Sequence, residues 1–377
     1  MLTQADRLFL LLLRIAMRGE QPDPTPFLGL EESVWRRIRH LARAHAVAGF
    51  VGDTILKLPK EALPPRQLYL KIFTEVEMTK EGNRRLLAGL KDLMTKLEEV
   101  ELPFVLLKGL GLSQYYPKPE LRAGGDLDLL YYSETDYLWA NVFLMQEGYH
   151  LHVESEARRG HTAFSYRSTL VENHARAVFF DLKRHNAYFE RLVQAAIREG
   201  RLERVSLGEG VEVDTLPAEL NALYIFIHIF FHWLHWGVGF RQYCDWLLYL
   251  EAHRPELDNS RFTEMAQRLD ILYPMQLFAQ AAIRYLGAAP ELFPFPLLEE
   301  DDPHSEDVLQ DVLRGGNFGF GQRPEPASNV WVSNWRKLTF KARRSRRLYA
   351  ITPHHASRII WGSVLGHVML HLRPRGW

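Results

Sequence analysis

Apolar residues recur at helical spacing in two long regions of the chain, one on each side of a stretch with strand-like runs. In the first region, apolar positions three and four residues apart predict helices that bury one face. These helices are expected over residues 3–18, 31–48 and 68–100. The second helical region, residues 216–288, opens with Pro217 and Glu219, which are typical of a helix start.

Short apolar runs bounded by turn residues lie between the helical regions and predict a sheet. Strands are expected over residues 104–107, 126–132, 149–153 and 177–183, with a hairpin over 161–174 and a helix over 135–147. The sequence therefore predicts an α+β fold in which a mixed-sheet core is embedded between N-terminal and C-terminal helical regions. The expected parts are a helical N-terminal region (1–98), the α/β core (99–190), a helical domain (191–290), a linker rich in proline and glycine (291–330) and a basic helical tail (331–377).

The composition argues against nucleic acid as a partner and against disulfides and membrane-spanning segments. The 46 Lys and Arg residues balance 46 Asp and Glu residues, so no overall field favours nucleic acid, which is not an expected partner. The single cysteine, Cys244, excludes an internal disulfide and fits a reducing compartment. The apolar run near the N-terminus is short and follows charged residues, so we interpret it as an amphipathic helix rather than a signal peptide. No run approaches the roughly 20 apolar residues of a transmembrane helix, and a cytoplasmic location is expected.

Two aspartates mark the centre of the predicted sheet. Asp126 and Asp128 are two residues apart in a leucine-rich run, so a strand places both side chains on one face. Neighbouring carboxylates that are removed from water repel each other and lose hydration. A divalent cation with oxygen ligands is the usual partner of such a pair. The pattern therefore predicts a metal site on this strand.

A wider set of residues around the aspartates resembles a known family. The set comprises Lys108-Gly109, Tyr116-Pro117, Arg122 and the run Gly125-Asp126-Leu127-Asp128-Leu129-Leu130. It resembles the signature of a largely uncharacterised bacterial nucleotidyltransferase family within the DNA polymerase beta-like superfamily. The resemblance implies a nucleotidyltransferase core, Mg²⁺ or Mn²⁺ as cofactor and a nucleoside triphosphate as substrate. The superfamily turn is Gly-Ser or Gly-Gly, whereas here it is Lys-Gly, and 16 residues separate Gly109 from Asp126.

The same resemblance implies roles for residues that flank the aspartates. Lys108 offsets the charge of the triphosphate, while Gly109 and Gly125 let the backbone approach it closely. Arg122 contacts a phosphate through two parallel hydrogen bonds, or else forms a salt bridge with the carboxylates of the strand. These four residues are the expected nucleotide-binding residues of the core.

The superfamily keeps a third acidic residue on a neighbouring strand. Asp181 lies inside the apolar run 177–183 and resembles the acidic position of an acidic-Leu-His-Trp phrase in the family. We therefore predict Asp181 as the third catalytic residue and metal ligand, together with Asp126 and Asp128. Glu172 is the competing candidate, although its polar neighbours favour a solvated hairpin.

The second helical region carries further candidates. His228, His232 and His235 share one helix face, but no carboxylate or cysteine on that helix completes a zinc site, so we favour a structural role. The stretch from His228 to Asp245 resembles the helical half that closes over the nucleotide in this family. This resemblance implies that Arg241 lines the cleft, whereas an i,i+4 pair between Arg241 and Asp245 is the alternative.

Two segments near the C-terminal end have less specific patterns. Residues 315–319, Gly-Gly-Asn-Phe-Gly, resemble a short segment of some family members, and we interpret them as a tight turn anchored by Phe318 rather than a phosphate cradle. Residues 331–377 contain no acidic residue. Their basic run could meet nucleic acid, anionic lipid or an acidic partner, or could be a solvated face that is balanced by acidic residues 299–302.

The sequence thus favours an enzyme that moves a nucleoside monophosphate from a nucleoside triphosphate to a hydroxyl group by two-metal catalysis, with release of pyrophosphate. The acceptor is expected to be a small molecule, a sugar or a protein hydroxyl, and no residue pattern chooses among ATP, GTP, CTP and UTP. One alternative is a nucleotide-binding or regulatory module that kept the fold without turnover. A transferase that modifies RNA is the other alternative, supported by the basic tail alone.

Overall fold

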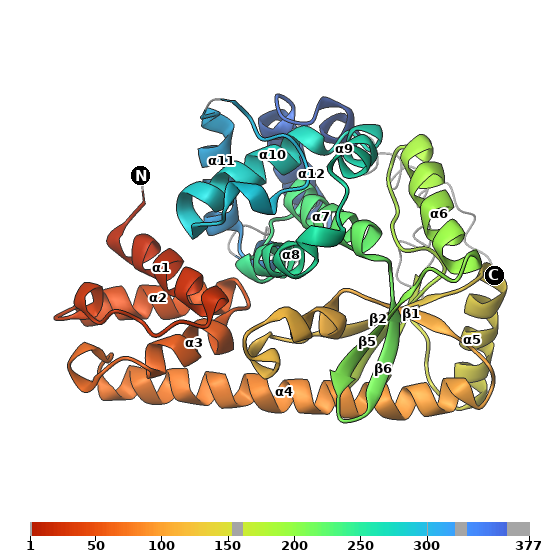
Figure 1. Cartoon of the computed structure of the whole chain (residues 1–377), viewed down its shortest axis with the longest axis horizontal. Helices are drawn as coiled ribbons and strands as arrows, with labels where there is room; N and C mark the ends of the chain where they lie inside the picture. The colour runs from red at the N-terminus through yellow and green to blue at the C-terminus, as the bar shows by residue number, and fades with distance from the viewer. Residues whose placement is uncertain (1, 153–160, 300, 321–329, 360–377) are drawn as a thin grey trace.

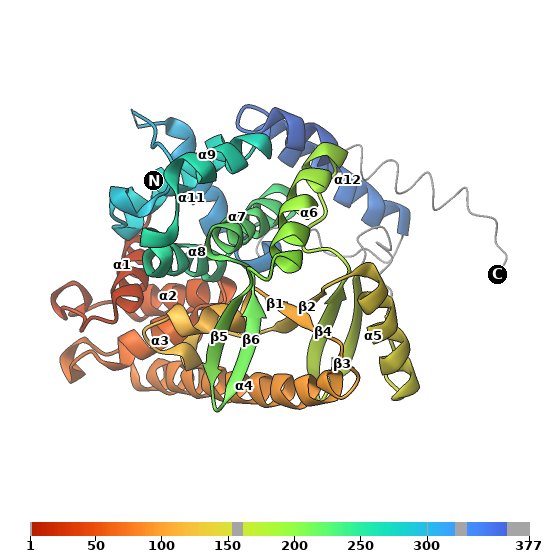
Figure 2. The same ribbon diagram turned by 45° about the vertical axis from the view of Figure 1, so that its right-hand side comes forward.

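A 33-residue helix, α4 (Arg66–Glu98), extends along one side of the whole molecule. At a rise of 1.5 Å per residue it is about 50 Å long. The computed structural model describes residues 2–152, 161–299, 301–320 and 330–359. Within this part of the chain, α4 contacts the N-terminal helices at one end and the sheet at the other, and the C-terminal helices lie on the opposite side of the sheet (Figure 1). A second view shows the same three layers, which are α4, the sheet and the C-terminal helices (Figure 2).

The N-terminal helices follow the predicted pattern, with one break. Helix α1 begins after Thr3, whose side chain accepts a hydrogen bond from the Asp6 backbone, while the Asp6 carboxylate accepts one from the Thr3 backbone. The helix expected over 31–48 ends early because Ala46 adopts a left-handed conformation with φ of 55°. The N-terminal helices are α1 (Gln4–Arg18), α2 (Glu32–Ala44) and α3 (Ala48–Leu56).

The six strands form one mixed sheet, which confirms the predicted α+β class. Strand β1 is antiparallel to β2 and parallel to β6, while β2 is parallel to β4. The order across the sheet is β3-β4-β2-β1-β6-β5. The strands are β1 (Phe104–Leu107), β2 (Asp126–Tyr131), β3 (His161–Tyr166), β4 (Thr169–His174), β5 (Glu203–Gly208) and β6 (Val211–Thr215).

The two faces of the sheet belong to two different hydrophobic cores. Along β2, Leu127, Leu129 and Tyr131 pack with leucines of α4 and of α5 (Glu134–Gln146). Leu130 points to the other face and joins the larger core that includes the C-terminal helices. Since side chains alternate along a strand, Asp126 and Asp128 share this second face with Leu130. The aspartates therefore point at the helical half of the molecule.

Two of the predicted strands are wrong. Residues 149–152 contain only an isolated bridge between His152 and Ala163, and residue 153 lies outside the described residues. Residues 177–182 are irregular and lead into α6 (Lys183–Arg198). The amide of Asn186 bonds both the N–H and the C=O of Phe180, and Phe180 is buried against aromatic rings of the helical half. The apolar run 177–180 therefore supplies the helical core and not the sheet.

The hairpin β5–β6 was not expected, and it completes the sheet beyond residue 190. Its signal is present in the sequence, because Val205, Leu207, Val211 and Val213 alternate with polar residues around a Gly-Glu-Gly turn at 208–210. Val205, Val211 and Val213 pack with the α4 side of the sheet. The sheet therefore extends into the segment that was assigned to the helical domain.

The C-terminal half is helical, and its first helix is a core helix. In α7, thirteen of the eighteen residues are buried, so apolar side chains surround the whole helix. Pro303–Gly315 form helix α11 inside the segment that was expected to be a linker. The C-terminal helices are α7 (Ala218–His235), α8 (Phe240–His253), α9 (Asn259–Arg268), α10 (Leu272–Ala281), α11 (Pro303–Gly315) and α12 (Val330–Leu348).

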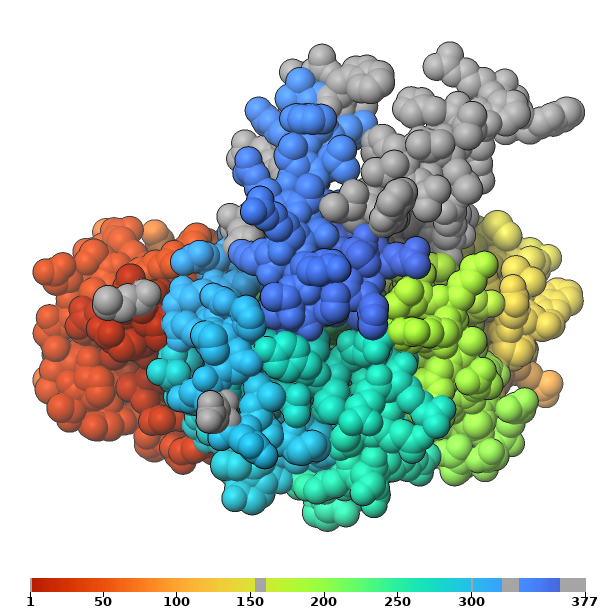
Figure 3. Space-filling view, turned by 90° about the horizontal axis from the view of Figure 1, so that it is seen from above, coloured from red at the N-terminus to blue at the C-terminus, as the bar shows by residue number. Residues whose placement is uncertain are grey.

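The basic run on α12 has one buried member. Arg344 pairs with Asp311 of α11 at 2.7 Å and donates hydrogen bonds to the carbonyls of Trp233 and Leu234 near the end of α7. Arg347 pairs with the same aspartate. Lys341 is half-buried over the ring of Trp236, whereas the remaining basic side chains of the helix are exposed. The helix extends past the upper edge of the main body in Figure 3. Asp311, rather than residues 299–302, therefore balances the buried charge.

Replacing Asp311 by asparagine should lower the free energy of unfolding by about 3 kcal/mol, because Arg344 would keep its charge in a buried site without a counter-charge. Urea unfolding followed by circular dichroism measures the change. Asp307→Asn is the matched control, since Asp307 lies on the same helix with a side chain that is 69% exposed. Equal stability of the two variants would contradict a stabilising role for this pair.

Candidate active site

Three acidic side chains meet on the face of the sheet that points toward α7. Asp128 on β2 is opposite Glu172 on the parallel strand β4. Asp126 is at the start of β2, two residues earlier on the same face. Asp128 has no exposed surface, whereas Asp126 and Glu172 are half-buried. The strand register thus gathers a buried carboxylate and two partly accessible carboxylates in one place.

Two basic side chains hold the buried carboxylate of Asp128. Lys108 Nζ lies 3.0 Å from Asp128 Oδ2, and His174 Nε2 lies 3.0 Å from Asp128 Oδ1. His174 is also 3.5 Å from Glu172 Oε2. The Lys108 contact is an ion pair without hydrogen-bond geometry, because Asp128 Oδ2 has no hydrogen-bond partner among the described residues. One of the two oxygens of Asp128 is therefore available for a better ligand.

The charges of this cluster support one another. Burial by itself lowers the pKa of His174, but hydrogen bonds and charge from Asp128 and Glu172 outweigh burial and raise it to about 9. The hydrogen bond with His174 lowers the pKa of Glu172. Burial also opposes the charge on Lys108, yet Asp128 and Asp126 raise the pKa of its ammonium group. At neutral pH, three carboxylates thus meet two cations, which leaves room for further positive charge.

The backbone of the Lys-Gly turn after β1 is strained at Lys108, and the side chain of Lys108 contacts Asp128. Lys108 adopts φ of 40° and ψ of −143°, which is unusual for a residue with a side chain. Gly109 follows with φ of 54°, and a Cβ at this position would lie 3.3 Å from the carbonyl oxygen of Asp126. Glycine is therefore required for the turn to approach β2 closely. Strain of this kind concentrates at functional sites.

A small cavity lies between this turn and the helical half. It has a volume of about 20 Å³, and Lys108, Gly125 and Asp126 line it on the sheet side, while His228 and Arg241 line it on the helical side. The prediction that Arg241 lines the cleft agrees with this position. A cavity of this size holds a water molecule or two, so a nucleotide requires the walls to move apart.

Arg241 is a half-buried cation whose buried Nε has no hydrogen-bond partner, and it has no acidic partner among the described residues. Its Nη1 donates to the carbonyl oxygen of Ala123 at 3.1 Å. Burial, followed by the charge of Arg122, lowers the pKa of the Arg241 guanidinium. A half-buried guanidinium that has an unsatisfied Nε–H and faces a cavity is suited to bind an anion. The alternative, an i,i+4 pair with Asp245, is not formed.

Arg122 takes the partner that this alternative assigned to Arg241. Its Nε and Nη2 each lie 2.8 Å from one oxygen of Asp245, and both side chains are buried. The hydroxyl of Tyr116 donates to the same carboxylate at 2.7 Å. Arg122 was expected either to contact a phosphate or to pair with the carboxylates of β2. It forms a salt bridge, but its partner is Asp245 of α8. Arg122 therefore fixes α8 against the loop that precedes β2.

The structure does not place Asp181 on the sheet with the other acids. Asp181 is in a bend before α6, its side chain is exposed, and the strand that was expected to carry it does not form. The premise that burial makes Asp181 a metal ligand is therefore wrong. Glu172, the competing candidate, lies beside Asp128. Sequence reasoning underrated Glu172 because the polar pair Asn173-His174 suggested solvent, whereas Asn173 is buried and bonded to Tyr131 and Asn141.

The three histidines of α7 have different surroundings. His228 lines the cavity, and burial and then the charge of Lys108 keep its pKa well below the usual value. His232 packs between the rings of His228 and Phe318. His235 stacks on Phe231. Among the described residues, the group of side chains that could hold a metal ion lies elsewhere, on β2 and β4.

The ligand atoms of that group fit a divalent cation. One atom each from Asp128, Glu172 and His174 lie within 4.8 Å of one another. Because His174 is protonated at neutral pH, the carboxylates are the suitable ligands and His174 is a counter-charge. Asp126 adds a third carboxylate at the rim of the cavity. Mg²⁺ prefers ligands of this kind, namely one or two carboxylates together with water and phosphate oxygens.

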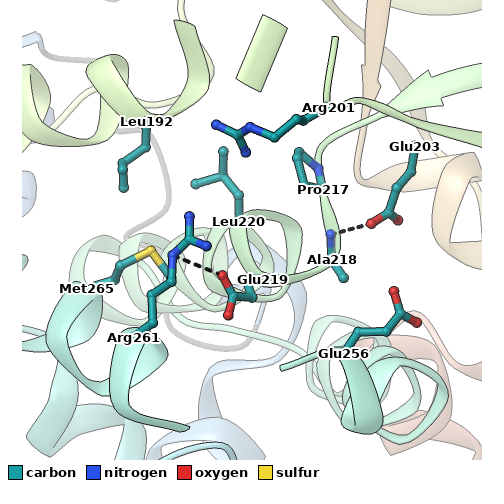
Figure 4. Close-up of a pocket in the computed structure, with 10 residues that line it drawn as sticks. All are labelled: Leu192, Arg201, Glu203, Pro217, Ala218, Glu219, Leu220, Glu256, Arg261 and Met265. Carbon is teal, nitrogen blue, oxygen red and sulfur yellow. Dashed lines mark hydrogen bonds and ion pairs between the residues drawn. The ribbon is translucent and has the colours of Figure 1, made fainter. Parts of the chain in front are cut away.

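A second, larger cavity is far from these strands along α7. It has a volume of about 290 Å³ and lies between α6, the start of α7 and α9 (Figure 4). The charges at its rim are paired within the chain, since Arg261 contacts Glu219 and Glu203 accepts a hydrogen bond from the Ala218 backbone. The cavity at Lys108 and Arg241 therefore remains the candidate active site.

Comparison with known protein families shows the family to which the chain belongs. A family model described as uncharacterised nucleotidyltransferase matches residues 31–287, which is more than half of the chain. The chain belongs to this nucleotidyltransferase family. The matched region contains the three carboxylates, Lys108 and Arg241, whereas α11 and α12 lie beyond it. A search of curated proteins found no match. In the described residues, no helix is long and apolar enough to cross a membrane.

The ion pairs of His174 should make the stability of the metal-free protein depend on pH. Its pKa is about 9 in the folded state and 6.5 without the fold, so its contribution is complete below pH 6.5 and is lost as pH rises through 9. In EDTA, His174→Gln should therefore be less stable than the parent at pH 6, with a smaller difference at pH 9.5. Thermal unfolding measures both, and His40→Gln, which changes an exposed histidine, is the control. A difference that is constant over this range would contradict the assignment.

Proposed function

We propose that the protein transfers a nucleoside monophosphate from a nucleoside triphosphate to a hydroxyl acceptor, with Mg²⁺ or Mn²⁺ held by Asp126, Asp128 and Glu172. Family membership supports nucleotidyl transfer as the general reaction. The observation that carries the proposal is the cavity itself, which has Arg241 on one wall and Lys108 and Asp126 on the other. Cations for phosphates thus face the same space as Asp126, and Asp128 and Glu172 share the sheet face of Asp126.

The phosphate side of the site consists of Arg241 and Lys108. Arg241 has an unpartnered Nε and no acidic partner among the described residues, so a phosphate oxygen would relieve a buried charge. Lys108 forms an ion pair with Asp128. When a metal ion binds Asp128 instead, the ammonium group of Lys108 becomes available for a phosphate. Both side chains can bind the β- and γ-phosphates and stabilise the charge that develops on pyrophosphate as it leaves.

The acidic side of the site consists of the three carboxylates of β2 and β4. A divalent cation bound there would act as a Lewis acid on the α-phosphate and offset its negative charge. Glu172 suits a metal ligand better than a proton acceptor, because its hydrogen bond with His174 lowers its pKa. His174 orients the carboxylates of Asp128 and Glu172 through its two contacts.

The bonding changes are those of nucleotidyl transfer. The oxygen of the acceptor hydroxyl forms a bond to the α-phosphorus and loses its proton to water, and the bond from this phosphorus to the oxygen bridging the β-phosphate breaks. Pyrophosphate leaves with the electron pair. The acceptor is proposed to be a small molecule, a sugar or a protein hydroxyl. The basic face of α12 is outside the cavity, so it gives no specific support to an RNA substrate.

Asp126→Asn should abolish metal-dependent binding of nucleoside triphosphates while the protein stays folded, because Asp126 is at the rim of the cavity and is only half-buried. A thermal-shift screen of ATP, GTP, CTP and UTP with Mg²⁺ or Mn²⁺ tests this. A ligand at about 100 times its dissociation constant stabilises the parent by about 2.7 kcal/mol. Glu134→Gln, at the exposed start of α5, is the control. If Asp126→Asn binds a triphosphate as well as the parent does, the metal assignment is wrong.

Glu172→Gln should reduce pyrophosphate release by about 100-fold or more, since one metal ligand supports several kcal/mol of transition-state stabilisation. Asp181→Asn should retain the rate of the parent, because Asp181 is exposed and lies away from the cluster. The assay is pyrophosphate release from each triphosphate with water as the acceptor. Loss of activity in Asp181→Asn but not in Glu172→Gln would reverse the assignment. Binding without release in the parent would favour the regulatory module.

A further inference from the structure

A single aromatic side chain beyond the family-matched region reaches into the candidate active site. Phe318 follows α11 and lines the cavity together with Lys108, Asp126 and Arg241. Its side chain is 37% exposed, although large apolar side chains near the helical core are mostly buried. The expectation that Phe318 only anchors a tight turn does not account for this exposure. The position of this partly exposed ring at the cavity, beside Lys108 and Arg241, is suited to contact a ligand there.

The backbone at Phe318 is strained. It adopts φ of 53° and ψ of 28°, the left-handed region that residues with side chains rarely occupy. Glycines flank it, with Gly316 at φ of 64° and Gly319 at φ of 73°. Such strain costs about 1–3 kcal/mol and persists where the surroundings determine the conformation. The strain at Phe318 is therefore maintained by the packing around it.

That packing is a close contact between two loops that are rich in glycine. A Cβ at Gly237 would lie 3.1 Å from the Cα of Gly315, and one at Gly239 would lie 3.1 Å from Asn317. The side chain of Gln242 donates to Asn317 Oδ1 at 2.8 Å. The loop before α8, which leads to Arg241, is thus joined to the loop that carries Phe318. The two loops place a cation and an aromatic ring at the same cavity.

The ring of Phe318 also has a support behind it. His232 of α7 contacts it edge to face, with ring centroids 4.6 Å apart and an angle of 76°. His232 in turn packs against His228 at 4.3 Å, and His228 lines the cavity. This series of rings limits where Phe318 can move. It also gives two of the three histidines of α7 a function other than metal binding.

We propose that Phe318 is the platform on which the nucleobase of the bound nucleoside triphosphate stacks. The inference rests on the proposed function, because Lys108 and Arg241 must hold the phosphates in the same cavity. A planar base is the part of the nucleotide that an exposed aromatic ring recognises, and stacking tolerates every base because each has a π face. Phe318 thus contributes affinity for the nucleoside without selecting among the four bases.

The size of the cavity agrees with a movement of Phe318. About 20 Å³ is too small for a base, so a side chain of the lining must move before the nucleoside can bind. Phe318 is the aromatic member of the lining with exposed surface, and it has open space toward solvent. Because His232 lies behind the ring, the ring of Phe318 can turn only toward its exposed side, while the joined loops keep its backbone in place.

Comparing two ligands that share their phosphates tests the proposal. Dissociation constants for Mg²⁺ with each of the four nucleoside triphosphates, and for Mg²⁺ with inorganic tripolyphosphate, are measured by calorimetry on the full chain. Phe318→Ala should weaken all four nucleotides by about 5- to 150-fold, the range expected for one base stacked on one aromatic ring. Its affinity for tripolyphosphate should equal that of the parent. Phe318→Trp should bind the nucleotides at least as tightly as the parent.

Phe320→Ala is the matched control, because Phe320 lies two residues further along, is 71% exposed and does not line the cavity. It should leave every dissociation constant unchanged. The proposal is overturned if Phe318→Ala weakens tripolyphosphate as much as nucleotides, since Phe318 would then only support the phosphate site. Unchanged nucleotide affinity with slower pyrophosphate release would place Phe318 at the acceptor and also overturn it. If the parent binds neither kind of ligand, the proposed function itself fails.

Discussion

The burial of one carboxylate, that of Asp128, is the constraint on which the rest of the site depends. A carboxylate without exposed surface is costly unless cations and hydrogen bonds compensate it. The fold supplies Lys108 from the turn after β1 and His174 from the end of β4, each 3.0 Å away. Their positions require the strand order of this sheet, in which β2 lies between β1 and β4. The mixed topology is therefore not incidental, because a different neighbour of β2 would leave Asp128 without one of its cations.

The helical half completes the site because it is fixed to the sheet by polar contacts. The long segment between Gly109 and Asp126 brings Tyr116 and Arg122 to Asp245, so that α8 has a defined position over the start of β2. Once Asp245 is committed to Arg122, Arg241 one turn earlier has no acidic partner among the described residues and faces the cavity. The 16-residue spacing that departs from the superfamily pattern thus has a structural role. It joins the sheet to the helical half. Because Arg122 pairs with Asp245, Arg241 can bind an anion.

The sequence could predict those features that depend on local pattern. Alternation along 126–131 placed both aspartates on one face, and the helical spacing of apolar residues located the helices around the sheet. It could not predict contacts that depend on tertiary choice. The run 177–180 is as apolar as a strand, yet it packs into the helical core because Asn186 fixes the turn at Phe180. Glu172 has polar neighbours and appears solvated, whereas the partner strand makes its position half-buried. The hairpin at 203–215 did carry a period-two signal, and its omission was an error of interpretation.

The Lys-Gly turn gives the site a property that a Gly-Gly or Gly-Ser turn would lack. A glycine at position 108 would leave Asp128 with His174 alone, whereas the strained lysine provides a second cation within the fold. Under the proposed function, a metal ion on Asp128 would compete with this ammonium group, which lines the cavity that Arg241 also lines. Metal binding and phosphate binding would then be linked, since a metal ion on Asp128 would free Lys108 for a phosphate. The turn that departs most from the superfamily pattern thus places a side chain where the proposed function needs a cation for the triphosphate.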